Sequence, residues 1–341
     1  MDSEAALSML ALAEDAEMGL SGPESSRWRE NLEKRLGELQ GAAAWFLEHG
    51  EPARALRLAA GLAGFWRDTG RVAEGRRWME SVLAGPGADV PSAARAKALS
   101  GLGTLAFKQG DQEASRAQNE DALRIARAAD DWPAQILALV GLSRVALRDG
   151  DVGAAREHAE EARTLARNMR DRDAESSPLH LLAAAARVAG DLRRAQQLYD
   201  ESLDLARELK DDAMIAVELL NLGHVERNLD NHDRSEELFR QSLRLSLAHG
   251  SGRLVPDCLV GLGCTAAARE DLHRAARLLG AAEARLQEAG VFLDPDDKPE
   301  FDRAVSLVRA GLEPGTFTAL WEEGRSMDAE MAVGLALEGS A

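Results

Sequence analysis

The fold is decided by one stretch of sequence, residues 211–250, which reads DDAMIAVELLNLGHVERNLDNHDRSEELFRQSLRLSLAHG. Apolar residues recur at helical spacing on both sides of a short polar turn, Asp230-Asn231-His232. This spacing indicates two helices joined as a hairpin, because Asp and Asn tolerate turn conformations and cap helices. Gly223 lies in the first of these helices, where it leaves room for another helix to approach closely.

The same pattern recurs in one register of 40 residues. Each copy has a leucine followed by a small residue, and a second small residue lies twelve positions after the first. The leucines are Leu62, Leu102, Leu142, Leu182, Leu222 and Leu262. The first small residues are Ala63, Gly103, Ser143, Ala183, Gly223 and Gly263, and the second are Gly75, Ser115, Ala155, Ala195, Ser235 and Ala275. A period of this length is typical of a solenoid, in which each unit buries its apolar face against its neighbours.

We therefore predict an all-α chain with three parts. Residues 51–290 form six 40-residue repeats, with turns between helices at every twentieth residue. One series of turns is Gly70, Gly110, Gly150, Gly190, Asp230 and Glu270, and the other is Gly50, Asp130, Arg170, Lys210, Gly250 and Gly290. Residues 1–50 form an N-terminal helical cap, a degenerate repeat with helices over 2–18 and 26–49. Residues 291–341 form a C-terminal helical cap, with three shorter helices over 295–338 broken near Asp294-Pro295, Pro314 and Gly324.

Composition and charge argue against several classes of function. The chain has 341 residues with a net charge of −17, which argues against generic nucleic-acid binding, because neutralising phosphates requires a basic surface. No long apolar run and no basic leader segment are present, so we expect neither a membrane span nor secretion. The two cysteines, Cys258 and Cys264, are six residues apart. They would point to different sides of a helix, so we expect neither a disulfide nor a metal pair between them. A chain without disulfides is typical of a reducing compartment, so we expect a cytoplasmic protein.

Two resemblances follow from these residues. Segments such as Asn221-Leu222-Gly223 and Ala189-Gly190-Asp191 resemble tetratricopeptide repeats (TPRs), which implies a right-handed superhelical solenoid. The standard repeat has about 34 residues, so both helices are extended here. More narrowly, Phe65-Trp66, the segment 74–78 and the segment 277–283 resemble the sensor region of LuxR-type and antibiotic-regulatory-type signal-transduction ATPase (STAND) transcriptional regulators.

The resemblance implies sensing or partner binding only. The phosphate-cradling motif Gly-x-x-x-x-Gly-Lys-Ser/Thr is missing from the sequence, and no segment outside the repeats is large enough for a DNA-binding module. We therefore expect a chain without the ATPase and DNA-binding domains of those regulators. The histidines and carboxylates show no spacing typical of a metal site or an acid–base pair. We predict no catalytic residues, no metal, no cofactor and no enzymatic activity.

In repeats of this kind the first helix of each unit lines the concave wall. The positions expected to be exposed on that wall are mostly basic, and the candidate ligand-binding or partner-binding residues are Arg67, Lys108, Arg144, Arg148, His180, Arg187, His224, Arg227 and Asn228. Two interpretations remain open for this basic stripe. In the first, it binds an acidic peptide, a partner protein or a small anionic effector. In the second, its cations pair with carboxylates of the outer wall or are simply solvated, and the groove has no ligand. In the second case the chain is an assembly module that docks through its outer or end surfaces.

Overall fold

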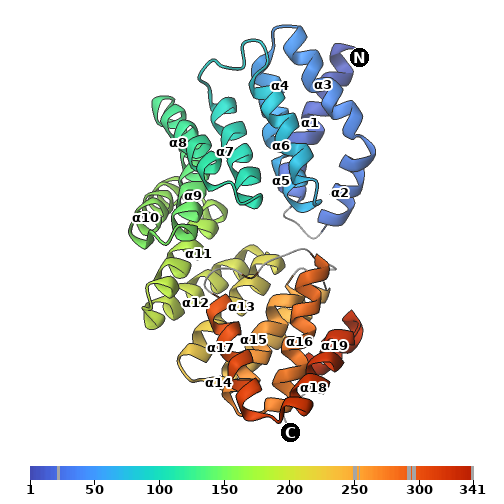
Figure 1. Cartoon of the computed structure of the whole chain (residues 1–341). Helices are drawn as coiled ribbons and strands as arrows, with labels where there is room; N and C mark the ends of the chain where they lie inside the picture. The colour runs from blue at the N-terminus through green and yellow to red at the C-terminus, as the bar shows by residue number, and fades with distance from the viewer. Residues whose placement is uncertain (21–23, 249–251, 253, 290–292, 294–296, 339–341) are drawn as a thin grey trace. The chain divides into compact units, whose positions relative to one another are not determined.

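The computed structural model describes residues 1–20, 24–248, 252, 254–289, 293 and 297–338, and helices make up nearly all of this part of the chain (Figure 1). The helices are α1 (Ser3–Gly19), α2 (Ser25–Lys34), α3 (Leu36–Glu48), α4 (Pro52–Gly61), α5 (Ala63–Asp68), α6 (Val72–Leu83), α7 (Ala93–Lys108), α8 (Gln112–Ala128), α9 (Trp132–Arg148), α10 (Val152–Met169), α11 (Arg172–Val188), α12 (Leu192–Leu209), α13 (Asp212–Asn228), α14 (His232–Ala248), α15 (Val255–Ala268), α16 (Leu272–Ala289), α17 (Lys298–Gly311), α18 (Pro314–Ser326) and α19 (Ala329–Leu337). The predicted all-α fold of TPR-like helix hairpins is confirmed.

The chain divides into two compact units, Met1–Ala185 and Ala186–Ala341. In unit 1, α7 packs against α8 and α9 against α10, with α8 packed on α9. In unit 2, α13 packs against α14 and α15 against α16, with α14 packed on α15. Within each unit these hairpins thus bury their apolar faces against one another, as a repeat array requires.

Most turns between the repeat helices share a left-handed residue and an aspartate that caps the next helix. At the predicted turn positions the backbone adopts the left-handed conformation, with φ of 78° at Gly190 and 57° at Lys210. The next residue is an aspartate in most repeats, and its carboxylate accepts a hydrogen bond from the backbone N–H three residues later, as Asp191 does from Arg194 at 3.1 Å. This cap satisfies an N–H group that the first turn of a helix leaves without a partner. The turns predicted at Gly250 and Gly290 lie outside the described residues.

The small residues of the repeat mark the places where helices cross closely. Within two hairpins the serine at one small position donates to the carbonyl of the other, Ser143 to Ala155 and Ser235 to Gly223, each at 2.8 Å. The buried ring of Phe239 fills the space that two glycines leave. A Cβ atom would lie 2.7 Å from the ring at Gly223 and 2.5 Å from it at Gly261, so only glycine fits at either position without a shift of the ring.

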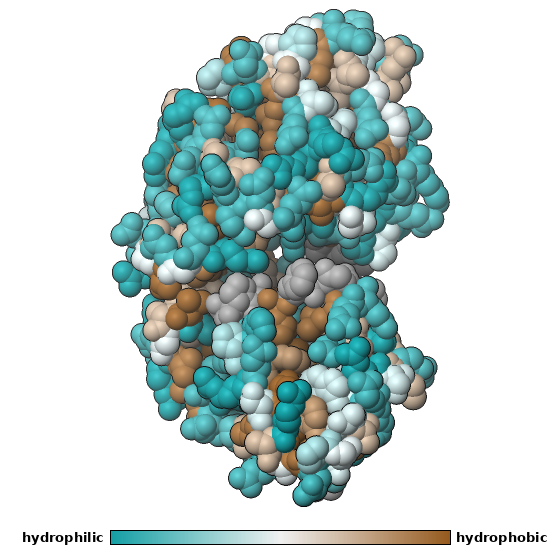
Figure 2. All heavy atoms as spheres, viewed as in Figure 1, coloured by the Kyte–Doolittle hydropathy of each residue, from teal (hydrophilic) through white to brown (hydrophobic). Residues whose placement is uncertain are grey.

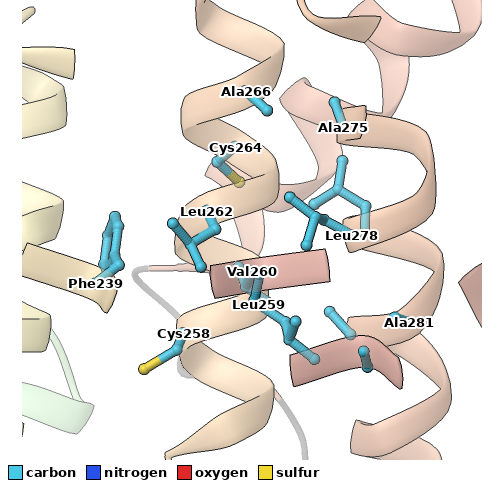
Figure 3. Packing of buried hydrophobic residues seen from close by; sticks show 14 of the residues in the cluster. Phe239, Cys258, Leu259, Val260, Leu262, Cys264, Ala266, Ala275, Leu278 and Ala281 are labelled. Atoms are coloured by element: carbon cyan, nitrogen blue, oxygen red, sulfur yellow. The ribbon is translucent and has the colours of Figure 1, made fainter. Parts of the chain in front are cut away.

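The core of unit 2 is built around α15. Figure 3 shows Phe239 of α14 facing the side of α15 that carries Leu262, while Leu278 of α16 lies across from it. Both cysteines of α15, Cys258 and Cys264, are buried and free. Burial raises the pKa of the Cys258 thiol to about 12 and that of Cys264 to about 11, so both behave as small apolar groups at neutral pH.

Three helices differ from their predicted bounds. The single helix predicted over 26–49 is broken at Arg35, which adopts a non-helical conformation (φ −107°, ψ 9°) between α2 and α3. The first helix of the first repeat is broken at Leu62, between α4 and α5. The last break falls at Met327-Asp328 instead of Gly324, because Gly324 is buried in α18 against the α16 backbone at Arg277. The break predicted at Asp294-Pro295 lies outside the described residues.

The outer surface agrees with the acidic, polar composition. Hydrophilic residues predominate on the face shown in Figure 2, and the hydrophobic ones form separate patches. In the part of the chain that the structure describes, no helix combines the length and the apolar character needed to cross a membrane.

Candidate functional site

Four of the predicted residues meet in unit 2, and we call them the unit 2 cluster: Arg187, His224, Arg227 and Asn228. Arg187 lies in the last turn of α11, and the other three lie in the last two turns of α13. The helical spacing of three and four residues keeps His224, Arg227 and Asn228 on one face of α13. The structure therefore brings these four predicted residues together in unit 2.

The unit 2 cluster already holds two carboxylates, Asp297 and Glu300, from the start of α17. Arg187 Nη1 donates to Asp297 Oδ1 at 3.0 Å. Glu300 is held by both of its oxygens: Arg227 Nη2 donates to Oε2, and Asn228 Nδ2 donates to Oε1 at 2.8 Å. The site therefore grips carboxylates with charge-assisted hydrogen bonds, which are stronger than neutral ones.

Burial makes these contacts stronger than surface ion pairs. His224 is 3% exposed and Arg227 is 7% exposed, although the sequence pattern predicted both on an open wall. They are covered because α17 packs against α15 and α16 with its acidic end on α13. Burial opposes ionisation of Asp297, but His224 and Arg187 outweigh it and hold the pKa of Asp297 below its ordinary value. Burial also lowers the pKa of Arg227.

The α17 carboxylates and His224 also form a group that could hold a metal ion, with ligand atoms within 4.8 Å of one another. His224 Nδ1 lies 3.8 Å from Asp297 Oδ1 and 3.8 Å from Glu300 Oε2. The same two carboxylates, however, contact Arg187 and Arg227. A divalent cation would meet two guanidinium charges at this place, so the arrangement favours an ion-pair network over a metal site.

The predicted residues of unit 1 are less closely grouped. Arg67 is exposed, and two of its nitrogens donate to Asp68, each at 2.8 Å. Arg148 stacks over the Phe107 ring, with 4.9 Å between its Cζ atom and the ring centroid. Lys108 is exposed at the end of α7. His180 is half-buried in the middle of α11.

Arg144 of α9 differs from all the others. It is half-buried, and within the described ranges its guanidinium makes no hydrogen bond and no ion pair. Burial, together with the nearby positive charge of Arg67, lowers the pKa of Arg144 to about 10. At neutral pH Arg144 is therefore a cation that is partly desolvated, repelled by another cation and not neutralised by an acid.

Sequence reasoning missed Asp297 and Glu300. They lie outside the repeat register, 110 and 73 residues from the arginines they contact, and nothing in the repeat pattern reports on such distant pairs. One signal was present, an Asp-x-x-Glu sequence at the predicted start of a helix in an otherwise degenerate cap.

Comparison with known protein families identifies the family of this chain. The model of the MalT-like TPR region family matches residues 94–323, which is more than half of the chain. The chain belongs to this family. The match covers the hairpins from α7 to α16, all of α17 and most of α18, so it includes the unit 2 cluster, Asp297 and Glu300. No curated protein matches the chain.

Several solved structures resemble this MalT-like TPR region. A Rap protein complexed with competence and sporulation factor is 14% identical, with a TM-score of 0.62 over 95% of this chain and 88% of that one. Aspartyl phosphate phosphatase F from Bacillus subtilis is 11% identical, with a TM-score of 0.59 over 96% of each chain. The Rap conjugation gene regulator of plasmid pLS20, in complex with the Phr* peptide, is 12% identical, with a TM-score of 0.54 over 89% of this chain and 96% of that one. These similarities show the fold alone.

Proposed function

We propose that this MalT-like TPR region is a non-enzymatic binding scaffold that captures an acidic peptide, an acidic segment of a partner protein or a small anionic effector on the basic residues of its first helices. The observation that carries the proposal is the uncompensated charge of Arg144. A cation that is desolvated and close to Arg67 is costly in the unliganded protein, and a bound anion offsets both costs at once.

The chemistry of the site fits a carboxylate. Arginine presents a planar fork that can donate two parallel hydrogen bonds to one carboxylate. In unit 2, Arg187 and Arg227 each donate a charge-assisted hydrogen bond to one of the chain's own carboxylates. Each charge-assisted bond contributes about 1.5–3 kcal/mol, so two or three such bonds support micromolar capture after the cost of association is subtracted.

The comparisons support a peptide or protein partner. Two of the similar structures, a Rap protein and the pLS20 Rap regulator, are described as complexes with competence and sporulation factor and with the Phr* peptide. The residues that resemble LuxR-type and STAND regulators favour a regulator-derived sensor in the cytoplasm. In this proposal the scaffold needs no cofactor.

The test uses Arg144→Gln, which removes the charge and keeps a polar side chain. We expect two effects of opposite sign: the unliganded protein becomes equally or more stable to heat, and its affinity for a synthetic decaglutamate peptide falls at least about tenfold. The matched control is Arg124→Gln on the exposed side of α8, where Arg124 forms an ion pair with Asp121 of the same helix. A loss of stability with unchanged affinity would make Arg144 a purely structural residue and would contradict the proposal.

A second candidate function rests on a different observation. In unit 2 a hollow of about 590 Å³ lies between α14, α15, α16 and α19. Its lining is mostly apolar and includes Leu247, Val255, Pro256 and Val333, and the charged residues Arg285, Glu288 and Glu330 also line it. Exposed apolar hollows of this kind favour docking of a partner surface, which is the function of an assembly module with an idle groove. Val333→Asp discriminates the two functions, because it should abolish partner capture by an assembly module and leave decaglutamate binding unchanged in the groove scaffold.

A further inference from the structure

The contact between α17 and the unit 2 cluster suggests what the cluster recognises. We propose that Arg187, His224, Arg227 and Asn228 form a receptor for an Asp-x-x-Glu segment at the start of a helix. Asp297 and Glu300 of this chain are its internal occupant, and an acidic partner segment of the same pattern displaces them. This inference rests on the proposed function, which it deepens by naming the partner's motif and the contact that competes with it.

The unit 2 cluster contacts two carboxylates that are held at a fixed spacing. Asp297 is the residue before the first turn of α17, and Glu300 lies in that turn. Because they are three residues apart at a helix start, both side chains project to the same side. Arg187 takes the first carboxylate, while Arg227 and Asn228 take the second. A segment with only one of the two acids would fill half of the receptor.

The internal occupant does not use every donor of the site. Arg227 is 7% exposed, and its Nη1 atom is buried without a hydrogen-bond partner among the described residues. Glu300 contacts only the other terminal nitrogen, Nη2. A buried donor without a partner is costly, and a carboxylate that engages both nitrogens of the fork removes that cost. A partner placed for bidentate contact therefore has an advantage over the chain's own acid.

The apolar attachment of α17 is confined to one side of the helix. In this helix of 14 residues Ala304 and Val308 are buried, and Phe301 and Val305 are partly buried against the core around α15. The acidic end adds a separate set of contacts, to α11 and α13. A helix held in this way can exchange with a competitor without loss of the core around α15.

The experiment uses the full chain and a labelled 15-residue peptide with the sequence of residues 297–311, DKPEFDRAVSLVRAG. Fluorescence polarisation compares the wild-type chain with the double variant Asp297→Asn with Glu300→Gln, whose internal occupant is neutral. We expect the double variant to bind the peptide at least about tenfold more tightly, since competition in the same molecule is removed. Adding Arg187→Ala with Arg227→Ala to that variant should abolish the gain.

Two controls are matched to this design. A peptide with Asn and Gln in place of its Asp-x-x-Glu acids should not bind. Asp302→Asn, which neutralises an exposed acid of α17 that pairs with Lys298 of the same helix, should leave the affinity of the wild-type chain unchanged. If the double variant binds within about twofold of wild type, the receptor assignment is wrong.

Hydrogen exchange on the unaltered chain gives an independent readout if the double variant does not fold. Excess peptide should reduce protection of residues 298–311 while protection of α15 persists. Peptide binding with α17 fully protected would overturn the proposal. Its failure is distinguishable from failure of the proposed function, because decaglutamate binding that depends on Arg144 would persist when the unit 2 receptor is absent.

Discussion

Single left-handed backbone positions end many of the described helices. The turn residues with left-handed φ include several that are not glycine, namely Asp130, Arg170, Lys210, Asp230 and Glu270. An L-residue in this conformation costs about 1–2 kcal/mol, whereas the extra chain entropy of a glycine costs about 0.5–1 kcal/mol. The repeat tolerates this strain because the aspartate cap and the apolar packing on both sides hold the turn in place.

A reciprocal pair of substitutions tests this in unit 2. Lys210→Gly should stabilise the chain by about 0.5–1 kcal/mol, which is the difference between the strain it removes and the entropy it adds. Gly190→Lys should destabilise it by a similar amount. No atom lies within 4 Å of the Cβ position at Gly190, so its effect comes from the backbone alone. Urea unfolding measures both, and a shift of the same sign in the two variants would contradict the strain argument.

The helix hairpin is the element on which stability depends, and the repeat leucine is its central contact. Leu222 is 2% exposed between α13 and its neighbours. Leu222→Ala should cost about 2–5 kcal/mol through the cavity it leaves. Because each hairpin packs mainly on its neighbours, protection from hydrogen exchange should fall first in α13 to α15 and last in α1 to α4.

The matched control for this substitution is Leu137→Ala on α9, where the side chain is 42% exposed and little packing is lost. It should change stability by less than about 1 kcal/mol. Equal loss of protection along all of the described chain after Leu222→Ala would show that the hairpins do not unfold locally.

The helices and turns also show how much of the fold and of the site the sequence could predict. The 40-residue register predicted the hairpins and the turn positions because the same physical demand recurs at each copy. It did not predict the break at Arg35, which has no equivalent in another repeat. It predicted His224 and Arg227 on an open wall, although they are 3% and 7% exposed, because the cover comes from α17, outside the register. A repeat pattern reports on contacts between neighbours and carries no information on a distant segment that packs over them.

Over the full chain, acid should be more damaging than alkali. Glu175 is 2% exposed and accepts from Arg163, Arg167 and Arg172 at 2.9, 2.7 and 2.8 Å. Burial opposes its ionisation, but Arg163 and Arg167 outweigh burial and lower the pKa of Glu175 below the ordinary 4.5. The pKa values of Asp297 and Asp111 are lowered as well. Lowered carboxyl pKa values contribute stability that is fully present above the ordinary values and is lost as pH falls through the lowered ones.

Glu175→Gln tests this pH dependence. At pH 7 the variant should lose about 1–3 kcal/mol, because three guanidinium groups lose their acceptor. The difference between variant and wild type should shrink as pH falls below about 4.5, where Glu175 of the unfolded chain becomes protonated, and it should disappear once pH falls through the lowered pKa of the folded chain. Thermal unfolding followed by circular dichroism at pH 7, 5 and 3 measures it. Glu161→Gln, which removes an exposed pair with Arg127, should show a small and nearly constant effect; a constant loss at all three pH values for Glu175→Gln would refute the linkage.

Most of the described turns combine a left-handed residue with an aspartate cap, and this bears on how such a chain changes in length. The joint after α8 and the joint after α10 use the same chemistry, at Asp130-Asp131 and at Arg170-Asp171. Duplicating or deleting a block of 40 residues between equivalent joints would therefore bring together surfaces that are already complementary. A gain or loss of only a few residues inside a helix would move the following apolar side chains to another face of that helix, so they would no longer pack against the neighbouring hairpin. Descendants of this gene are thus expected to grow and shrink by whole units, and the number of basic positions offered to a partner would change in the same steps.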